Sequence, residues 1–151
     1  NYIILRTSWV FSEYGNNFVK TILNLVKSNN SLSIVSDQVG SPTYAGDIAK
    51  GLIVLSSKFN KSNTKEIYHI SGGPSCSWYE FAKTIVKALH SEGLINNVPK
   101  LIPILTMDYD DLVNRPAFTV LDCNKYFDEF KISSYRWKDS LYHVVKKLKH
   151  L

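Results

Sequence analysis

Short apolar runs and helix-spaced apolar stripes alternate along this chain. Residues 2–6 form a run rich in β-formers, which is typical of a buried strand. From Phe18 to Val26 the apolar side chains recur at helical spacing, which predicts an amphipathic helix over about 17–28. The same patterns predict strands at 32–35 and 67–70, an extended piece at 101–104, helices at 48–55, 81–89 and 137–148, and a short helix opened by Asp122. This alternation predicts an α/β protein with some parallel strand pairing.

Polar residues before these stripes indicate where helices begin. Asn16 follows Gly15 and is expected to cap the first helix, and Asp47 is expected to cap the second. Ser77-Trp78-Tyr79-Glu80 has the spacing of a capping box for the third. Pro103 confines residues 101–104 to an edge strand or a loop, and residues 105–121 are expected to form an irregular connection.

Composition places the chain among ordinary soluble domains. Its 151 residues suit one domain or a piece of one, with 44% apolar and 21% charged residues. No apolar run approaches the roughly 20 residues of a membrane span, so no membrane partner is expected. Cys76 and Cys123 lack disulfide or zinc spacing and are interpreted as reduced thiols of a cytoplasmic protein. The net charge of +5 suits a diphosphate ligand, whereas the basic segment 146–150 is interpreted as a solvated helix face, with no nucleic-acid partner.

Two motifs of nicotinamide-dependent enzymes can be searched for directly in the residues. The chain has no G-x-G-x-x-G loop, and Gly72-Gly73 is interpreted as a plain turn. Tyr-x-x-x-Lys, the spacing that lets a lysine lower a tyrosine pKa, occurs at Tyr79 and again at Tyr142. Neither follows the Ser/Thr-bearing strand end that would accompany a catalytic pair, so we expect chance spacing and assign no catalytic residue.

Several residues are candidates for binding, each with a simpler alternative. Trp9 lies past a strand end, where it can stack on a sugar or pack at the rim of the core. Arg115 can clamp a phosphate or remain a surface residue, and Gln38 and Thr43 can bind a hydroxyl or satisfy turn backbone. The acidic cluster Asp108, Asp110 and Asp111 lacks further ligands at loop spacing, which favours a solvated turn over a metal site.

Ordered blocks across most of the chain resemble dTDP-4-dehydrorhamnose reductases, which are extended short-chain reductases. The blocks are Arg6-Thr7-Ser8-Trp9-Val10-Phe11, Gly15 to Thr21, Asp37-Gln38-Val39-Gly40-Ser41-Pro42-Thr43, Ile67 to Ile70, Ser77 to Ala82, Asn114-Arg115-Pro116 and Leu121 to Lys125. Taken singly, only the block around Trp9 and the block from Asp37 to Thr43 are specific for this family. The resemblance implies the last strands of a Rossmann-like sheet plus a smaller substrate-binding subdomain.

The resemblance further implies that residues 1–151 are a single C-terminal substrate-binding portion, without the N-terminal cofactor-binding part. The intact enzyme would reduce dTDP-4-dehydro-6-deoxy-L-mannose to dTDP-L-rhamnose with NADPH or NADH, and this portion alone is expected to be inactive and to bind no cofactor tightly. The implied substrate-binding residues are Trp9, Gln38, Gly40, Pro42, Thr43 and Arg115. Exposed sheet and apolar surface suggest a homodimer.

One segment departs from the family, and one alternative function stays open. Tyr109-Asp110-Asp111-Leu112 replaces a Tyr-Pro-type segment before Arg115, so the loop over the sugar is expected to differ in detail from that of the family. The regulatory β subunit of methionine adenosyltransferase shares the fold and the Leu-Asp-Cys that stands here at Leu121 to Cys123. A non-catalytic binding or regulatory module is therefore the alternative.

Overall fold

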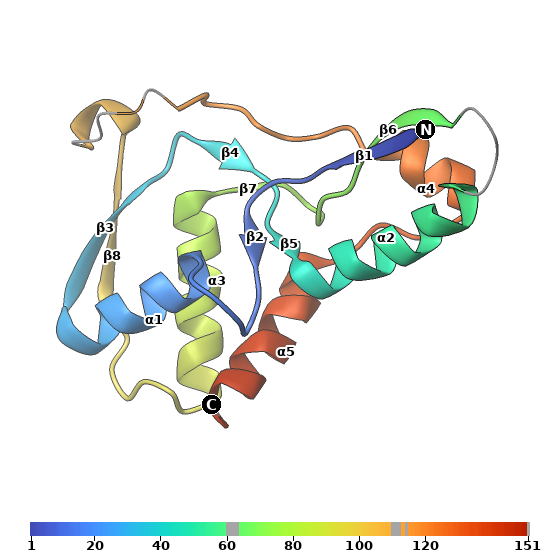
Figure 1. The fold of residues 1–151 in the computed structure, drawn as a ribbon. Helices are drawn as coiled ribbons and strands as arrows, with labels where there is room; N and C mark the ends of the chain where they lie inside the picture. The colour runs from blue at the N-terminus through green and yellow to red at the C-terminus, as the bar shows by residue number, and fades with distance from the viewer. Residues whose placement is uncertain (60–63, 110–112, 114, 151) are drawn as a thin grey trace.

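The computed structural model describes residues 1–59, 64–109, 113 and 115–150 (Figure 1). Strands and helices alternate along the chain, as the hydrophobic pattern predicts. In order, the elements are β1 (Tyr2–Arg6), β2 (Val10–Phe11), α1 (Phe18–Ser28), β3 (Ser31–Val35), β4 (Val39–Gly40), β5 (Thr43–Tyr44), α2 (Ala45–Phe59), β6 (Lys65–His69), β7 (Cys76–Ser77), α3 (Trp78–Ser91), β8 (Lys100–Ile104), the 3-10 helix η1 (Thr106–Asp108), α4 (Asn124–Phe130) and α5 (Trp137–Leu148). Within these ranges no helix has the length and apolar character needed to cross a membrane.

The strands form four small two-stranded sheets. β1 pairs with β6, β2 with β5 and β3 with β8, all in parallel, whereas β4 and β7 are antiparallel. The predicted α/β class with parallel pairing is confirmed. Pro103 lies in β8 opposite Ile34, and β8 pairs with β3 alone among the described strands, so the proline occupies an edge strand as expected.

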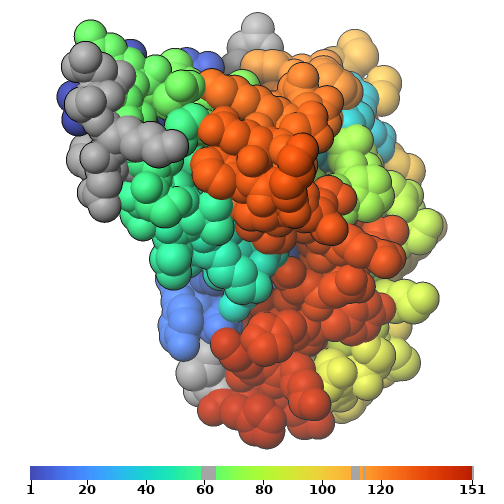
Figure 2. Space-filling view, turned by 90° about the vertical axis from the view of Figure 1, so that its right-hand side faces the viewer, coloured from blue at the N-terminus to red at the C-terminus, as the bar shows by residue number. Residues whose placement is uncertain are grey.

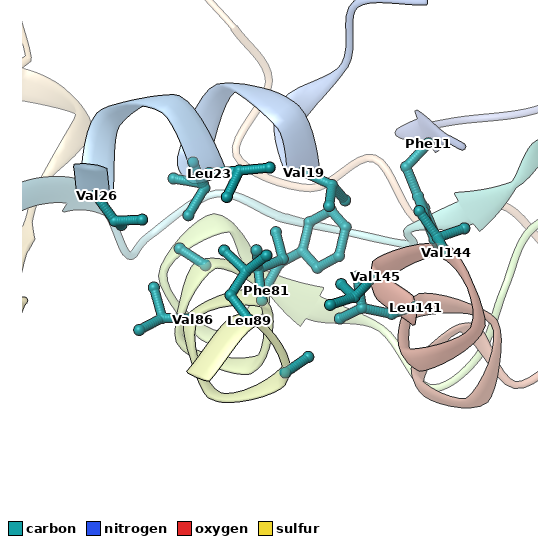
Figure 3. Packing of buried hydrophobic residues seen from close by; sticks show 14 of the residues in the cluster. Phe11, Val19, Leu23, Val26, Phe81, Val86, Leu89, Leu141, Val144 and Val145 are labelled. Carbon is teal, nitrogen blue, oxygen red and sulfur yellow. The ribbon is translucent and has the colours of Figure 1, made fainter. Parts of the chain in front are cut away.

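The larger core lies where α1, α3 and α5 meet. Figure 3 shows Phe81 of α3 between apolar side chains of α1 and α5. The Phe81 ring is fully buried and lies 5.5 Å from Phe18 and 5.3 Å from Trp137, measured between ring centroids. Trp137 also donates a hydrogen bond of 2.6 Å from its indole N–H to the carbonyl of Pro74. The helical spacing of apolar residues in all three helices therefore serves one shared core.

A second, smaller core joins α2 and α4 to β6. Tyr68 of β6 is 1% exposed and packs against Tyr126 and Phe130 of α4. Its hydroxyl donates to Glu129 at 2.7 Å, and Lys58 of α2 contacts both groups. Figure 2 views the molecule from this side, with α4 in orange above α5 in red. The aromatic packing is therefore reinforced by charged hydrogen bonds at its rim.

One face of the β1–β6 pair carries exposed apolar side chains in the part of the chain that the structure describes. Tyr2, Ile4 and Ile67 are 46%, 45% and 37% exposed, while Ile3, Leu5 and Tyr68 point toward the second core. This period-two alternation places three large apolar side chains on one outward surface. Self-association through this face stays a prediction.

Two predicted helix caps are wrong. Asn17, and not Asn16, caps α1, with its side-chain oxygen accepting from the N–H groups of Val19 and Lys20. α2 begins at Ala45, directly after β5, so Asp47 lies inside the first turn and does not cap it. Its carboxylate instead accepts from Lys50 and Ser140, which ties α2 to α5.

A nearly buried carboxylate connects the loop before α1 to the end of α5. Glu13 is 3% exposed, accepts from Lys147 at 2.5 Å, and lies 3.4 Å from the Tyr44 hydroxyl. Burial raises the pKa of Glu13, but the hydrogen bonds from Lys147, the Glu13 backbone and Tyr44, together with the positive charge of Lys147, bring the pKa below its usual value. Glu13 is therefore ionised in the folded protein near neutral pH.

The Glu13 ion pair predicts a loss of stability in acid. A carboxyl whose folded pKa lies below its unfolded value near 4.5 stabilises the fold above that pH, and this contribution is lost as pH falls through the folded pKa. We expect the melting temperature to fall between neutral pH and pH 3, and to fall less in Glu13→Gln. Thermal melts of both proteins across this range test the prediction, and parallel pH profiles would contradict it.

Candidate functional site

A hollow lies beside the carboxyl ends of β3 and β8. It is an open groove of about 700 Å³, bounded by α1, β3, the start of α3 and the chain that follows β8. The register places Val35 opposite Ile104, so the two parallel strands end side by side. The polar and aromatic side chains that line it include Phe18, Gln38, Trp78, Thr106, Tyr109 and Arg115. Carboxyl ends of parallel strands are where α/β sheets usually bind ligands.

Stacked aromatic rings build one wall of this groove. Trp78, the first residue of α3, lines the groove and stacks on Trp9 with ring centroids 3.6 Å apart and planes 9° apart. Phe18 packs against the same Trp78 ring at 4.6 Å. Gly40 lies against the Trp9 indole so closely that a Cβ there would fall 2.3 Å from a ring carbon. Trp9 therefore supports the Trp78 wall from behind.

The turn from Gln38 to Thr43 is held tightly to the segment around Trp9. The Ser8 hydroxyl donates to the Ser41 carbonyl at 3.1 Å, and the Thr43 N–H donates to the Trp9 carbonyl at 3.1 Å. Trp9 itself has φ of +46°, a left-handed conformation that is strained for a non-glycine residue. These contacts fix the indole against the turn, so the two specific sequence blocks meet in space.

The six sequence-predicted site residues divide into two groups. Gln38 and Arg115 line the groove, and Gln38 donates from its side-chain amide to the Thr106 hydroxyl at 3.1 Å. Trp9 and Gly40 are placed one layer behind the wall. Pro42 and Thr43 are buried, and the Thr43 hydroxyl accepts from the Gly72 N–H at 3.3 Å. Substrate contact by these six residues stays a prediction.

Sequence reasoning missed Trp78, Thr106 and Tyr109 as lining residues. Trp78 belongs to the segment that was interpreted as a capping box. Ser77 does cap α3, because its hydroxyl accepts from the Glu80 N–H at 3.1 Å. Thr106 and Tyr109 lie in the predicted irregular connection, where no periodic pattern marks a face. The sequence feature that could have indicated Trp78 is a large aromatic residue at the start of a helix.

The other sequence motifs lie away from the groove or outside the described residues. Tyr79 and Lys83 line a smaller hollow on the other side of α3, with Lys83 paired to Glu80 at 3.7 Å. Gly72 is packed under the Pro42 carbonyl, 2.2 Å from where a Cβ would lie. Gly72 therefore allows close packing of the turn on the backbone of Pro42.

No metal cluster is found in the part of the chain that the structure describes, taking groups of three or more His, Cys, Asp or Glu. Asp110 and Asp111 of the acidic cluster lie outside the described residues, as do Leu112 and Asn114. Cys76 is half-buried, and burial raises the pKa of its thiol to about 12, so it is protonated near neutral pH.

Parallel strands that end at an aromatic-lined groove define this chain as an α/β domain with a candidate binding site at its strand ends. A family model described as "RmlD substrate binding domain" matches residues 1–150. The chain belongs to this family.

Relatives in sequence and structure agree with that assignment. The dTDP-4-dehydrorhamnose reductase of Aggregatibacter actinomycetemcomitans is 45% identical over 144 residues, covering 94% of this chain and 49% of the relative. The crystal structure of a dTDP-4-dehydrorhamnose reductase from Clostridium acetobutylicum has a TM-score of 0.83 at 32% identity, covering 98% of this chain and 49% of that one. A reductase of the same name from Bacillus anthracis, in complex with NADP, has a TM-score of 0.75 at 33% identity and covers 97% and 48%. The chain thus spans about half the length of these relatives.

Proposed function

We propose that this chain is the substrate-binding portion of an NADPH-dependent reductase that converts dTDP-4-dehydro-6-deoxy-L-mannose to dTDP-L-rhamnose. The observation that carries the proposal is the groove, which combines an aromatic wall, a buried amide and an arginine at the carboxyl ends of β3 and β8. Its volume of about 700 Å³ falls in the range of small-molecule sites. Family membership supports the same substrate class.

Each lining group suits one part of a nucleoside diphosphate sugar. Arg115 presents a planar guanidinium that can bind two phosphate oxygens at once. Trp78 and Phe18 offer flat apolar rings for a base or a sugar face. Gln38 and Thr106 supply amide and hydroxyl groups for hydrogen bonds to sugar hydroxyls. The role of this portion is then to hold and orient the sugar, which lowers the barrier by positioning.

Binding of dTDP by the 151-residue chain tests this proposal. We expect saturable binding by isothermal titration calorimetry, and we expect Arg115→Ala to weaken it about tenfold, because a charged hydrogen-bond partner of the diphosphate is lost. Lys149→Ala, which removes an exposed cation next to the end of α5, serves as the charge-matched control and leaves affinity near that of the parent.

The outcomes are distinguishable. Absence of dTDP binding to the parent chain would refute the proposal for this portion alone. Equal weakening by the Arg115 and Lys149 substitutions would show that net charge attracts dTDP, and that Arg115 does not bind it specifically.

A further inference from the structure

A hydrogen-bonded contact joins the two strand ends at the groove. Just past β3, the Asp37 carboxylate accepts from the Thr106 N–H at 2.9 and 3.1 Å and from the Thr106 hydroxyl at 2.7 Å. Just past β8, Thr106 is the first residue of η1, 69 positions away in sequence. Ser36 adds two bonds to the Ile104 carbonyl, from its N–H at 2.9 Å and its hydroxyl at 3.0 Å. The two strands are thus tied together beyond their last paired residues.

Asp37 supplies the cap that η1 lacks locally. The first N–H groups of a helix have no acceptor within it, and Leu105, at the capping position, makes no side-chain hydrogen bond. The Asp37 carboxylate provides that acceptor from another segment of the chain. The hydrogen bonds from Thr106 hold the pKa of Asp37 below its usual value, so the carboxylate is ionised near neutral pH.

The segment held in this way forms part of the groove wall. Thr106, Met107 and Tyr109 all line the groove. Met107 is 85% exposed and Tyr109 is 53% exposed, so apolar burial contributes little to holding them. The Thr106 hydroxyl also accepts from the nearly buried Gln38, which joins the wall to the turn behind Trp9. Polar contacts to Asp37 and Gln38 therefore help to hold this wall in position.

We propose that Asp37 is a positioning residue of the groove, which fixes Thr106 so that the wall of residues 106–109 is formed before a ligand binds. The proposal rests on the proposed function above, because it concerns the same groove. Asp37 itself is not among the lining residues, so it acts through Thr106. Preorganisation of this kind raises affinity because less of the protein must be ordered on binding.

Three substitutions and two measurements test the proposal. Asp37→Ala removes the acceptor, and Asp37→Asn keeps one oxygen that can accept both the N–H and the hydroxyl of Thr106. Asp122→Ala is the matched control, because Asp122 is also an exposed carboxylate that accepts one backbone N–H, from Asn124 at 2.9 Å. The measurements are amide hydrogen exchange by NMR and dTDP affinity by calorimetry, on the full chain in each case.

We expect Asp37→Ala to speed exchange of the Thr106 and Tyr109 amides about tenfold and to weaken dTDP binding by a similar factor, since the competent wall is then less populated. Amides at the centres of β3 and β8 keep their exchange rates. Asp37→Asn restores both quantities to within about twofold of the parent, and Asp122→Ala changes neither. If the neutral side chain of Asp37→Asn restores the exchange rates and the dTDP affinity, the hydrogen bonds to Thr106 and not the negative charge are responsible for both.

Unchanged exchange at Thr106 in Asp37→Ala overturns the proposal, and so does unchanged dTDP affinity in that variant when the parent binds dTDP. Equal defects in Asp37→Asn and Asp37→Ala also overturn it, because charge would then be the cause. If the parent fails to bind dTDP, the proposed function fails, while the exchange measurement still decides whether Asp37 fixes the wall.

Discussion

Replacing Phe81 with alanine is expected to lower the free energy of unfolding by about 3–5 kcal/mol, which is the usual cost of truncating a fully buried phenylalanine. Phe81 is 0% exposed, and rings from β2, α1 and α5 surround it: Phe11, Phe18 and Trp137. Figure 3 shows Phe81 in a core whose labelled side chains come from α1, α3, α5 and β2, so truncation of the ring leaves a cavity between several elements. Urea unfolding followed by far-UV circular dichroism measures the change.

Phe118→Ala provides the control for this prediction. The chemical change is the same, but Phe118 is 69% exposed, so we expect a loss below about 0.5 kcal/mol. Similar destabilisation by both substitutions would mean that the helices do not share one core around Phe81.

Replacing Gly40 with alanine is expected to destabilise the protein by about 1–3 kcal/mol and to displace the Trp9 indole, as overpacking of a close contact does. A Cβ at this position would lie 2.3 Å from a Trp9 ring carbon. The ring cannot shift freely, because it stacks on Trp78 at 3.6 Å and its backbone is bound to Thr43. Near-UV circular dichroism reports the stacked indole pair, and urea unfolding reports the stability.

Gly73→Ala is the matched control, since the nearest atom to its added Cβ is the Tyr135 carbonyl oxygen at 3.9 Å, an ordinary contact. We expect this variant to keep the near-UV signal and most of the stability. If Gly40→Ala left both quantities unchanged, the close packing of Gly40 on Trp9 would not be what holds the aromatic wall.

Local patterns predicted the longer elements well. Residues 17–28 and 137–148 were predicted as helices and correspond to α1 and α5, because their apolar side chains repeat at helical spacing and pack on one core. The two-residue strands β2, β4, β5 and β7 were not predicted, because two residues are too few to show the alternation of apolar and polar positions that indicates a strand. The predicted cap at Asp47 was wrong, because β5 continues into α2 without a break.

The candidate site was only partly predictable. Gln38 and Arg115 were singled out by motif and both line the groove. Trp78 was not predicted as a lining residue because Ser77 and Glu80 indicate a helix start there, and a helix start gives no reason to expect a binding residue. Asp37 and Thr106 are 69 positions apart, and no local pattern connects an acidic loop residue to an irregular segment that far along the chain.

The amino-acid sequence by itself determined the α/β class, the main helices with their buried faces and the family resemblance, because each depends on the spacing of residues close together in the chain. Only the tertiary structure decided which residues line the groove. The parallel pairing of β3 with β8 brings Asp37 to Thr106. The close packing of Gly40 on Trp9 positions the indole on which Trp78, the wall of the groove, is stacked. These contacts join distant segments, and their geometry is set by how the sheets and helices pack.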